Sequence, residues 1–255
     1  MAVFTPEQEL ALLRQQHEAL LRAIAHDLRA PLRHVNSFAP LLMESVQELA
    51  QAARHDPGAQ QAVEDALEFA QHMQQGAQRM AQMVEALTQL SRAVRSNVQL
   101  QAVDAVALCQ SAWHAVLARQ PQYAQAQLHL PDVPILVQAD AQALAQIWQE
   151  LLANACKFAA PHAQVHLTAQ RQDNGRWLLQ LQDNGVGFDA AHAHMLFQPF
   201  ARMHRESEFP GLGCGLALAQ ALAQRQGAQL SIAAQPGQGC TVLLDWPAAL
   251  PLQNS

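Results

Sequence analysis

A histidine followed directly by an aspartate, His26 and Asp27, is the first pair of side chains with evident chemistry. His26 lies midway between the apolar residues Ile24 and Leu28, and two helical steps turn by about 200°, so its ring is expected to face solvent. Asp27 can hold one ring nitrogen protonated and leave the other free as a nucleophile at neutral pH. A histidine that is merely solvated on a polar helix face is the more common explanation of such a pair, so the functional interpretation depends on the rest of the sequence.

A second group of polar side chains, Glu150, Asn154 and Lys157, recurs at helical spacing within the segment QELLANACKF. This spacing allows the three to share one helix face. A carboxylate, an amide and an ammonium group suit magnesium and phosphates. An ordinary amphipathic helix with a stripe of leucines and Phe158 fits the same segment, and that interpretation does not exclude a ligand site.

Two glycine-containing segments follow. In DNGVGFD, residues 183–189, Asp183 ends an expected strand, and the glycines let the backbone approach a flat ligand closely. The carboxylate could accept a hydrogen bond from the amine of adenine, although Asp-Asn-Gly is also a common turn. In GLGCGLALAQ, residues 211–220, three glycines lead into a helix whose free amides can meet phosphate. The segment matches neither the Rossmann nor the Walker pattern.

A long helical hairpin is expected from about residue 10 to residue 94, a segment rich in Ala, Gln, Leu, Glu and Met. Apolar residues keep a spacing of three and four in both arms, which predicts a heptad seam. A lone hairpin buries only one side of each seam, so we expect a homodimer. The expected seam of the first arm contains Leu10, Leu13, Leu20, Ile24, Leu28, Val35, Phe38, Leu42 and Leu49.

The composition changes after residue 97, where aromatic and β-branched residues appear and short runs alternate in the manner of strands. Two strand hairpins are expected, one turning at residues 173–175 (DNG) and one formed by QLSIAAQ and CTVLLDW. Helices are expected at 141–158 and 215–225. The second half of the chain is therefore predicted to be a separate α/β domain.

Composition excludes several classes of function. The chain has 255 residues, half of them hydrophobic, and a formal charge of -6, which argues against a nucleic-acid partner. The sequence contains no apolar run of about 18 residues and no signal-peptide pattern, so we expect no membrane segment and a cytoplasmic location. Four dispersed cysteines predict neither disulfides nor a zinc site, and the spacing of His192 and His194 argues against a metal site there.

The order HDLRAPL, ELLANACKF, DNGVGFD, LFQPF and GLGCGLAL resembles the box series of sensor histidine kinases over residues 20–248. HDLRAPLR and the short segment LFQPFARMHRESEFPGLGCGL resemble the bacteriophytochrome-like subgroup, whose nucleotide lid is short. The resemblance implies an α hairpin forming a dimeric four-helix bundle, followed by an α/β two-layer sandwich of the GHKL (Bergerat) type. It divides the chain into a signalling coiled coil (1–22), a dimerisation and phosphotransfer hairpin (23–97), an ATP-binding domain (98–249) and a tail (250–255).

The same resemblance implies ATP-dependent autophosphorylation of His26, with Asp27 as its acid or base partner. The phosphoryl group would pass to an aspartate of a response-regulator receiver domain. Asn154 would be a Mg²⁺ ligand, Lys157 a phosphate contact and Asp183 the adenine anchor. Further nucleotide-binding residues implied by it are Gly185, Gly187, Phe200, Arg202, Gly211, Gly213, Gly215 and Thr241.

Two positions depart from the family pattern. Most such kinases carry Asn where this chain has Glu150, and related ATPases place a water-activating Glu there, so we expect measurable ATP hydrolysis. Ala30 stands where many relatives place Thr or Asn to position the water that dephosphorylates the partner, which predicts weak phosphatase activity. The alternatives left open are a phosphotransfer or scaffold protein that binds ATP poorly, and a GHKL-type ATPase. A sensor module is expected to be missing or on another chain.

Overall fold

The computed structural model describes residues 6–52, 57–95, 97–159, 161–205 and 207–249. The chain divides into two compact units, residues 1–92 and residues 93–255, and each is considered by itself. Among the described residues, no helix combines the length and the hydrophobicity that crossing a membrane requires.

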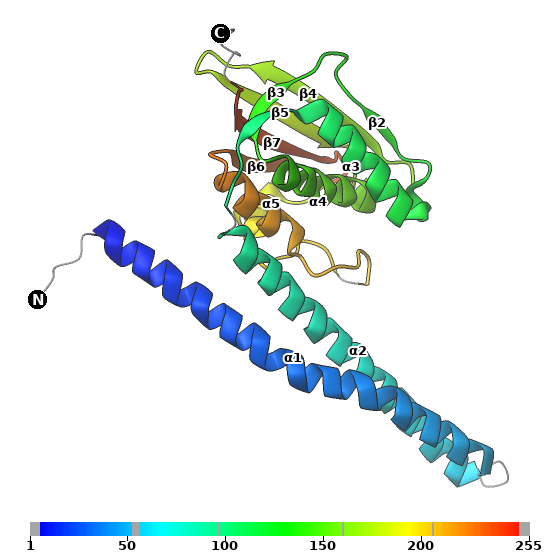
Figure 1. Ribbon diagram of the computed structural model, residues 1–255. Coiled ribbons are helices and arrows are strands. Elements are labelled where there is room, and N and C mark those ends of the chain that lie inside the picture. The colour runs from blue at the N-terminus through cyan, green and yellow to red at the C-terminus, as the bar shows by residue number, and fades with distance from the viewer. Residues whose placement is uncertain (1–5, 53–56, 96, 160, 206, 250–255) are drawn as a thin grey trace, which may run out of the picture. The chain divides into compact units, whose positions relative to one another are not determined.

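The first unit is the expected helical hairpin, made of α1 (Pro6–Ala52) and α2 (Pro57–Ala93), as Figure 1 shows. α1 continues through Pro31 and Pro40 without interruption. Its buried side chains recur every seventh residue, at Ala25, Leu32, Ala39 and Val46, and those of α2 at Ala70, Ala77, Val84 and Ser91. The buried side chains of the hairpin are thus largely small, and Ala25, Leu32, Ala77 and Val84 form one core cluster.

The seam expected for the first arm is only partly covered in the single chain. Leu28, Phe38, Leu42 and Leu49 belong to that seam and are 44%, 66%, 47% and 62% exposed. Their burial against a second copy of the chain stays a prediction. Periodicity identifies an apolar stripe but not which edge of it meets the neighbouring helix. The small residues pack inside the hairpin, and the large ones remain on its surface.

The second unit is an α/β sandwich with a five-stranded sheet in the order β2-β4-β5-β7-β6. β2 runs parallel to β4, and the other neighbours are antiparallel. A separate two-stranded sheet pairs β1 with β3. The strands are β1 (Gln101–Asp104), β2 (Gln127–His129), β3 (Leu136–Ala139), β4 (Gln164–Arg171), β5 (Arg176–Asp183), β6 (Gln229–Ala234) and β7 (Cys240–Pro247).

Three helices form the second layer of this unit: α3 (Ala105–Arg119), α4 (Ala141–Ala159) and α5 (Gly215–Gln224) (Figure 1). α4 is central, because it contacts α3, α5 and the strands β4 and β5. Alternate residues of the strands bury apolar side chains, among them Leu179, Leu244 and Trp246. Both predicted strand hairpins and both predicted helices are confirmed, each helix boundary to within one residue.

The turn at residues 173–175 shows why the first strand hairpin was predictable. Gly175 has a φ of 77°, a conformation that costs glycine little, and the backbone amide of Arg176 donates to Oδ1 of Asn174 over 3.0 Å. The amide of Gln172 donates to the carbonyl of Arg176. Local turn chemistry therefore sets the register of β4 against β5.

Candidate functional site

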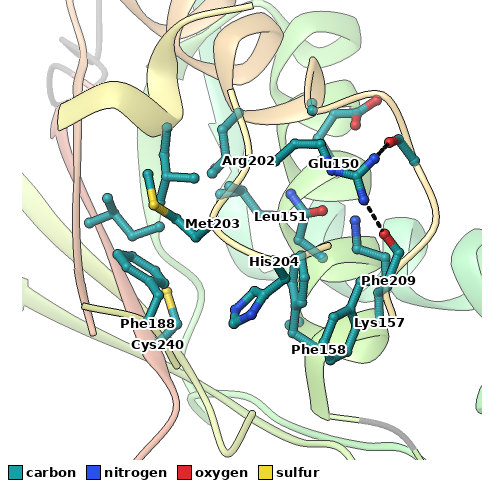
Figure 2. A pocket seen from close by; sticks show the side chains of 18 of the residues that line it. Glu150, Leu151, Lys157, Phe158, Phe188, Arg202, Met203, His204, Phe209 and Cys240 are labelled. Atoms are coloured by element: carbon teal, nitrogen blue, oxygen red, sulfur yellow. Dashed lines mark hydrogen bonds between the residues drawn. The ribbon is translucent and has the colours of Figure 1, made fainter. Parts of the chain in front are cut away.

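A cavity of about 350 Å³ opens in the second unit, bounded by α4, the turn after β5, the segment 201–214 and the start of α5 (Figure 2). Its wall is largely apolar, and the charged side chains in it are Glu150, Lys157, Asp183 and Arg202. The sequence-predicted residues that line it are Glu150, Asn154, Lys157, Asp183, Gly187, Arg202, Gly211, Gly213 and Gly215. Gly185, Phe200 and Thr241 lie outside the lining, although Cys240 and Val242 on either side of Thr241 belong to it.

α4 brings Glu150, Asn154 and Lys157 to the cavity, while its opposite face fills the core with residues such as Leu144 and Trp148. Burial raises the pKa of Glu150, and the nearby Lys157 ammonium partly offsets this rise. α4 is therefore amphipathic: its apolar face packs in the core, and its polar face lines the cavity instead of facing open solvent.

The Lys157 ammonium lies 4.3 Å above the ring of Phe158. Its pKa is lowered, first by burial and then by the like charge of Arg202, and the Glu150 carboxylate opposes both effects. The two cations Lys157 and Arg202 and the carboxylate of Glu150 thus all line this part of the cavity. An anionic ligand would relieve their repulsion, because opposite charge favours the protonated form of lysine.

Asp183 is held at the end of β5 by two backbone amides. Its Oδ1 accepts from Gly185 over 2.8 Å and from Cys240 over 3.1 Å. Burial raises the pKa of Asp183, and these two hydrogen bonds act in the opposite direction. Within the described part of the chain Oδ2 has no hydrogen-bond partner, so this oxygen is available to accept a bond from a ligand in the cavity.

Gly185 explains how the turn fits around this carboxylate. A methyl group on Gly185 would lie 2.8 Å from Oδ1 of Asp183 and 2.9 Å from the carbonyl oxygen of Phe158. The amide of Val186 donates to that same carbonyl over 3.0 Å. Gly185 therefore shapes the turn behind the cavity wall, which is why it does not itself line the cavity.

The start of α5 presents backbone amides to the cavity. Cys214, Gly215 and Leu216 line it, and no side chain caps the helix. A methyl group on Gly215 would lie 2.5 Å from Oε2 of Glu150, so a larger residue there would displace that carboxylate from the helix start. Uncapped amides and the positive end of the helix dipole make this a suitable place for phosphate.

Phe200 and Arg202 stabilise the segment before α5. The amide of Phe200, which has a φ of 67°, donates to the carbonyl of Gly213 over 3.0 Å. The guanidinium of Arg202 donates to the carbonyls of Gly211 and Phe209, the contacts dashed in Figure 2. Both residues therefore hold the shape of this segment, and Arg202 also contributes positive charge to the cavity.

Sequence reasoning missed several lining residues of the same segment, among them Met203, His204 and Phe209. His204 bonds to the carbonyl of Gly187, and its ring packs against Phe158 and Phe209. The signal available in the sequence was weak, since it consisted only of a histidine and a phenylalanine in the short stretch between LFQPF and GLGCGL.

The side chains of His26 and Asp27 lie outside the described residues, as do those of His192 and His194. The backbone of residues 26 and 27 is part of α1; the neighbouring Ala25 is buried, and Leu28 is exposed. The solvent-facing position of His26 stays a prediction. Among the described residues, no group of three or more His, Cys, Asp or Glu side chains could hold a metal ion.

Residues 139–250 match the family of histidine kinase-, DNA gyrase B- and HSP90-like ATPases. The chain is 27% identical over 224 residues to the phytochrome-like protein Cph1 of Synechocystis, a match that covers 88% of this chain and 28% of that protein. It is also 27% identical over 248 residues to the adaptive-response sensory kinase SasA of Thermosynechococcus vestitus, with 91% and 63% covered. The chain thus spans under two thirds of these relatives.

Solved structures agree on the fold. Full-length ShkA in complex with AMPPNP has a TM-score of 0.58 at 22% identity, over 92% of this chain and 47% of that one. The mycobacterial sensor histidine kinase MprB has a TM-score of 0.51 at 24% identity, over 59% of this chain and 98% of that one.

Proposed function

Because this chain carries the catalytic core of a sensor histidine kinase, with an ATPase domain of the GHKL family, we propose that it uses ATP to phosphorylate its own His26. The phosphoryl group would then pass to an aspartate of a response-regulator receiver domain. The observation that carries the proposal is the cavity that combines a partly buried carboxylate, Asp183, with a cationic end at Lys157 and an uncapped helix start.

The two ends of this cavity suit the two ends of ATP. Oδ2 of Asp183 would accept a hydrogen bond from the adenine amine, within apolar walls that exclude water from the base. The phosphates would meet Lys157 and the amides at the start of α5, where the charge of the site is positive. Each end therefore offers the chemistry that one part of the nucleotide requires.

The residues around Asn154 also fit a magnesium ion. Asn154 and Glu150 both line the cavity, and their side chains offer an amide oxygen and a carboxylate, the hard donors that Mg²⁺ takes together with substrate phosphates. Bound there, the ion would neutralise charge on the phosphates. Asn154 would be its protein ligand, with Glu150 beside it.

Transfer would proceed in line. A ring nitrogen of His26 attacks the γ-phosphorus, the bond from phosphorus to the bridging oxygen breaks, and ADP leaves with the electron pair. Asp27 would hold the other ring nitrogen in the orientation that exposes the nucleophile. His26 belongs to the first unit and the cavity to the second, so residues 92–103 would serve as a hinge that lets them meet.

We also propose that a second copy of the chain packs against the hairpin to form a dimer. Large apolar side chains remain exposed on both of its helices, and such a surface on a soluble helix pair is normally covered. A dimer would complete a four-helix bundle. The residues exposed there are Leu28, Phe38, Leu41, Leu42, Leu49, Phe69, Met73 and Met80.

The test is incubation of the purified protein with Mg²⁺ and γ-labelled ATP. The expected label is acid-labile and alkali-stable, as phosphohistidine is, and it disappears in His26→Ala. His34→Ala is the matched control, because His34 is an exposed histidine of the same helix and should leave the label intact. Label that survives in His26→Ala would refute the assignment. Absence of label despite measured ATP binding would favour the phosphotransfer or ATPase alternatives.

A second activity, slow ATP hydrolysis, is favoured by one observation. The Glu150 carboxylate approaches the start of α5 so closely that a methyl group on Gly215 would lie 2.5 Å from its Oε2. There it lies beside the proposed phosphate site with a raised pKa, as a general base for water requires. The kinase and the hydrolase would share one cavity.

A further inference from the structure

His204 connects three walls of the cavity. Its Nε2–H donates to the carbonyl of Gly187 over 3.0 Å, at the turn after β5. Its ring centroid lies 5.5 Å from that of Phe158 on α4 and 5.1 Å from that of Phe209. Phe158 and Phe209 are themselves 4.9 Å apart, and all three ring pairs are tilted, the arrangement that aromatic rings favour (Figure 2).

The carbonyl that accepts this bond is rigidly held. Gly187 has a φ of 61°, and a methyl group there would lie 2.0 Å from the carbonyl oxygen of Gln235. The preceding residue is tied to the same loop, since the amide of Gly237 donates to the carbonyl of Val186 over 2.7 Å. His204 is thus attached to a fixed part of the site rather than to another loop of its own segment.

The segment that His204 attaches also carries the cationic side of the cavity. Arg202 is two residues away and bonds to the carbonyls of Phe209 and Gly211. A methyl group on Gly211 would lie 3.6 Å from Nζ of Lys157. Loss of the His204 anchor would therefore loosen both the apolar cover around Phe158 and the placement of these positive charges.

We propose that His204 is a nucleotide-positioning residue, which sets the affinity for ATP by holding Arg202 and Phe209 in place beside Gly187 and Phe158. The inference rests on the proposed kinase function and deepens it. His204 lines the cavity, yet it acts through the shape of the site and takes no part in the transferred bonds. Its loss should weaken binding and leave the rate at saturating ATP nearly unchanged.

Two substitutions separate the contributions of the ring and the bond. His204→Phe keeps an aromatic ring between Phe158 and Phe209 but cannot donate to Gly187. His204→Asn keeps a donor and loses the ring. The same substitutions at His114, an exposed histidine of α3, are the matched controls.

The measurements are the Kd of a non-hydrolysable ATP analogue and of ADP, the KM and kcat of autophosphorylation, and the unfolding midpoint of the ligand-free protein. We expect His204→Phe to raise Kd and KM about tenfold, the effect of one lost hydrogen bond, while kcat and the midpoint stay close to wild type. His204→Asn should also bind more weakly. Both His114 variants should bind as the wild type does.

Unchanged Kd in both His204 variants would overturn the inference, and so would a lower kcat at saturating ATP with normal Kd. The binding arm does not depend on phosphotransfer. If the wild type bound the analogue but formed no phosphohistidine, the kinase proposal would fail while the Kd comparison still decided the role of His204. A wild type that bound no nucleotide would refute both.

Discussion

Lys157 and Glu150 line the same cavity and carry opposite charges. Burial lowers the pKa of Lys157 and raises that of Glu150, so it favours the neutral form of each. For Lys157 the like charge of Arg202 adds to this effect. An anionic ligand would offset the repulsion between Lys157 and Arg202, which is a physical argument for a phosphate-bearing ligand that does not depend on the similarity to histidine kinases.

Glu150→Gln tests the second activity at this scale. In a His26→Ala background, which removes the phosphoacceptor, we expect the substitution to lower steady-state ATP hydrolysis about a hundredfold, since amides are not general bases. An ordinary glutamate has a pKa of about 4.3, and burial raises the pKa of Glu150 above its ordinary value. The general base is the ionised form, so hydrolysis should rise with pH as the pH passes through this raised pKa.

Glu64→Gln, at an exposed glutamate of α2, is the control for this substitution. The Kd of an ATP analogue, measured alongside, separates loss of chemistry from loss of binding. Hydrolysis unchanged by Glu150→Gln would leave the carboxylate only a role in orienting magnesium-bound water.

At the scale of secondary-structure elements, α4 positions Glu150, Asn154 and Lys157 in the cavity. Hydrogen bonds to Asp140 cap its first turn. Oδ1 of Asp140 accepts from the amides of Gln142 and Ala143, and Oδ2 accepts from the amide of Gln99. The buried Gln226, just beyond α5, accepts from the amide of Asp140 over 2.7 Å and donates to the carbonyl of Leu222. The two helices that meet at the cavity are therefore linked at their far ends.

Removing this helix cap should destabilise the second unit. We expect Asp140→Ala to lower the free energy of unfolding by about 1 kcal/mol in urea titrations, whereas Asp140→Asn, which can still cap, should cost much less. The hydrogen bonds lower the pKa of Asp140, that of Gln99 most. The stabilisation by the Asp140 carboxylate should therefore be complete above the ordinary aspartate pKa of about 3.9. It should be lost as the pH falls from there through the lowered pKa of the folded state. Equal stability of wild type and Asp140→Ala would contradict this account of α4.

At the scale of the whole molecule, the chain places its proposed phosphoacceptor and its nucleotide cavity in separate units. Small residues close the hairpin from within, and the large apolar side chains are left outside. Such a hairpin buries one apolar stripe between its own helices and leaves another exposed. This is the pattern expected of one half of a dimeric four-helix bundle.

Charging that surface should separate the proposed dimer. Light scattering should give the wild type a mass near twice the 27.9 kDa of one chain, and the double substitution Phe38→Glu with Met80→Glu should shift it toward a single chain. Leu136→Glu, at a half-exposed leucine of the second unit, should leave the mass unchanged. A wild type that stayed monomeric at micromolar concentration would refute the bundle.

The sequence by itself determined the elements and most of the site. Local turn chemistry at 173–175 and the spacing of Glu150, Asn154 and Lys157 depend on neighbours a few residues away, so they could be recognised without the fold. Only the tertiary structure decided which edge of the helical stripe is buried, where Arg202 donates and that His204 meets Gly187 and Phe158. These depend on contacts between segments far apart in the chain, and no local periodicity encodes them.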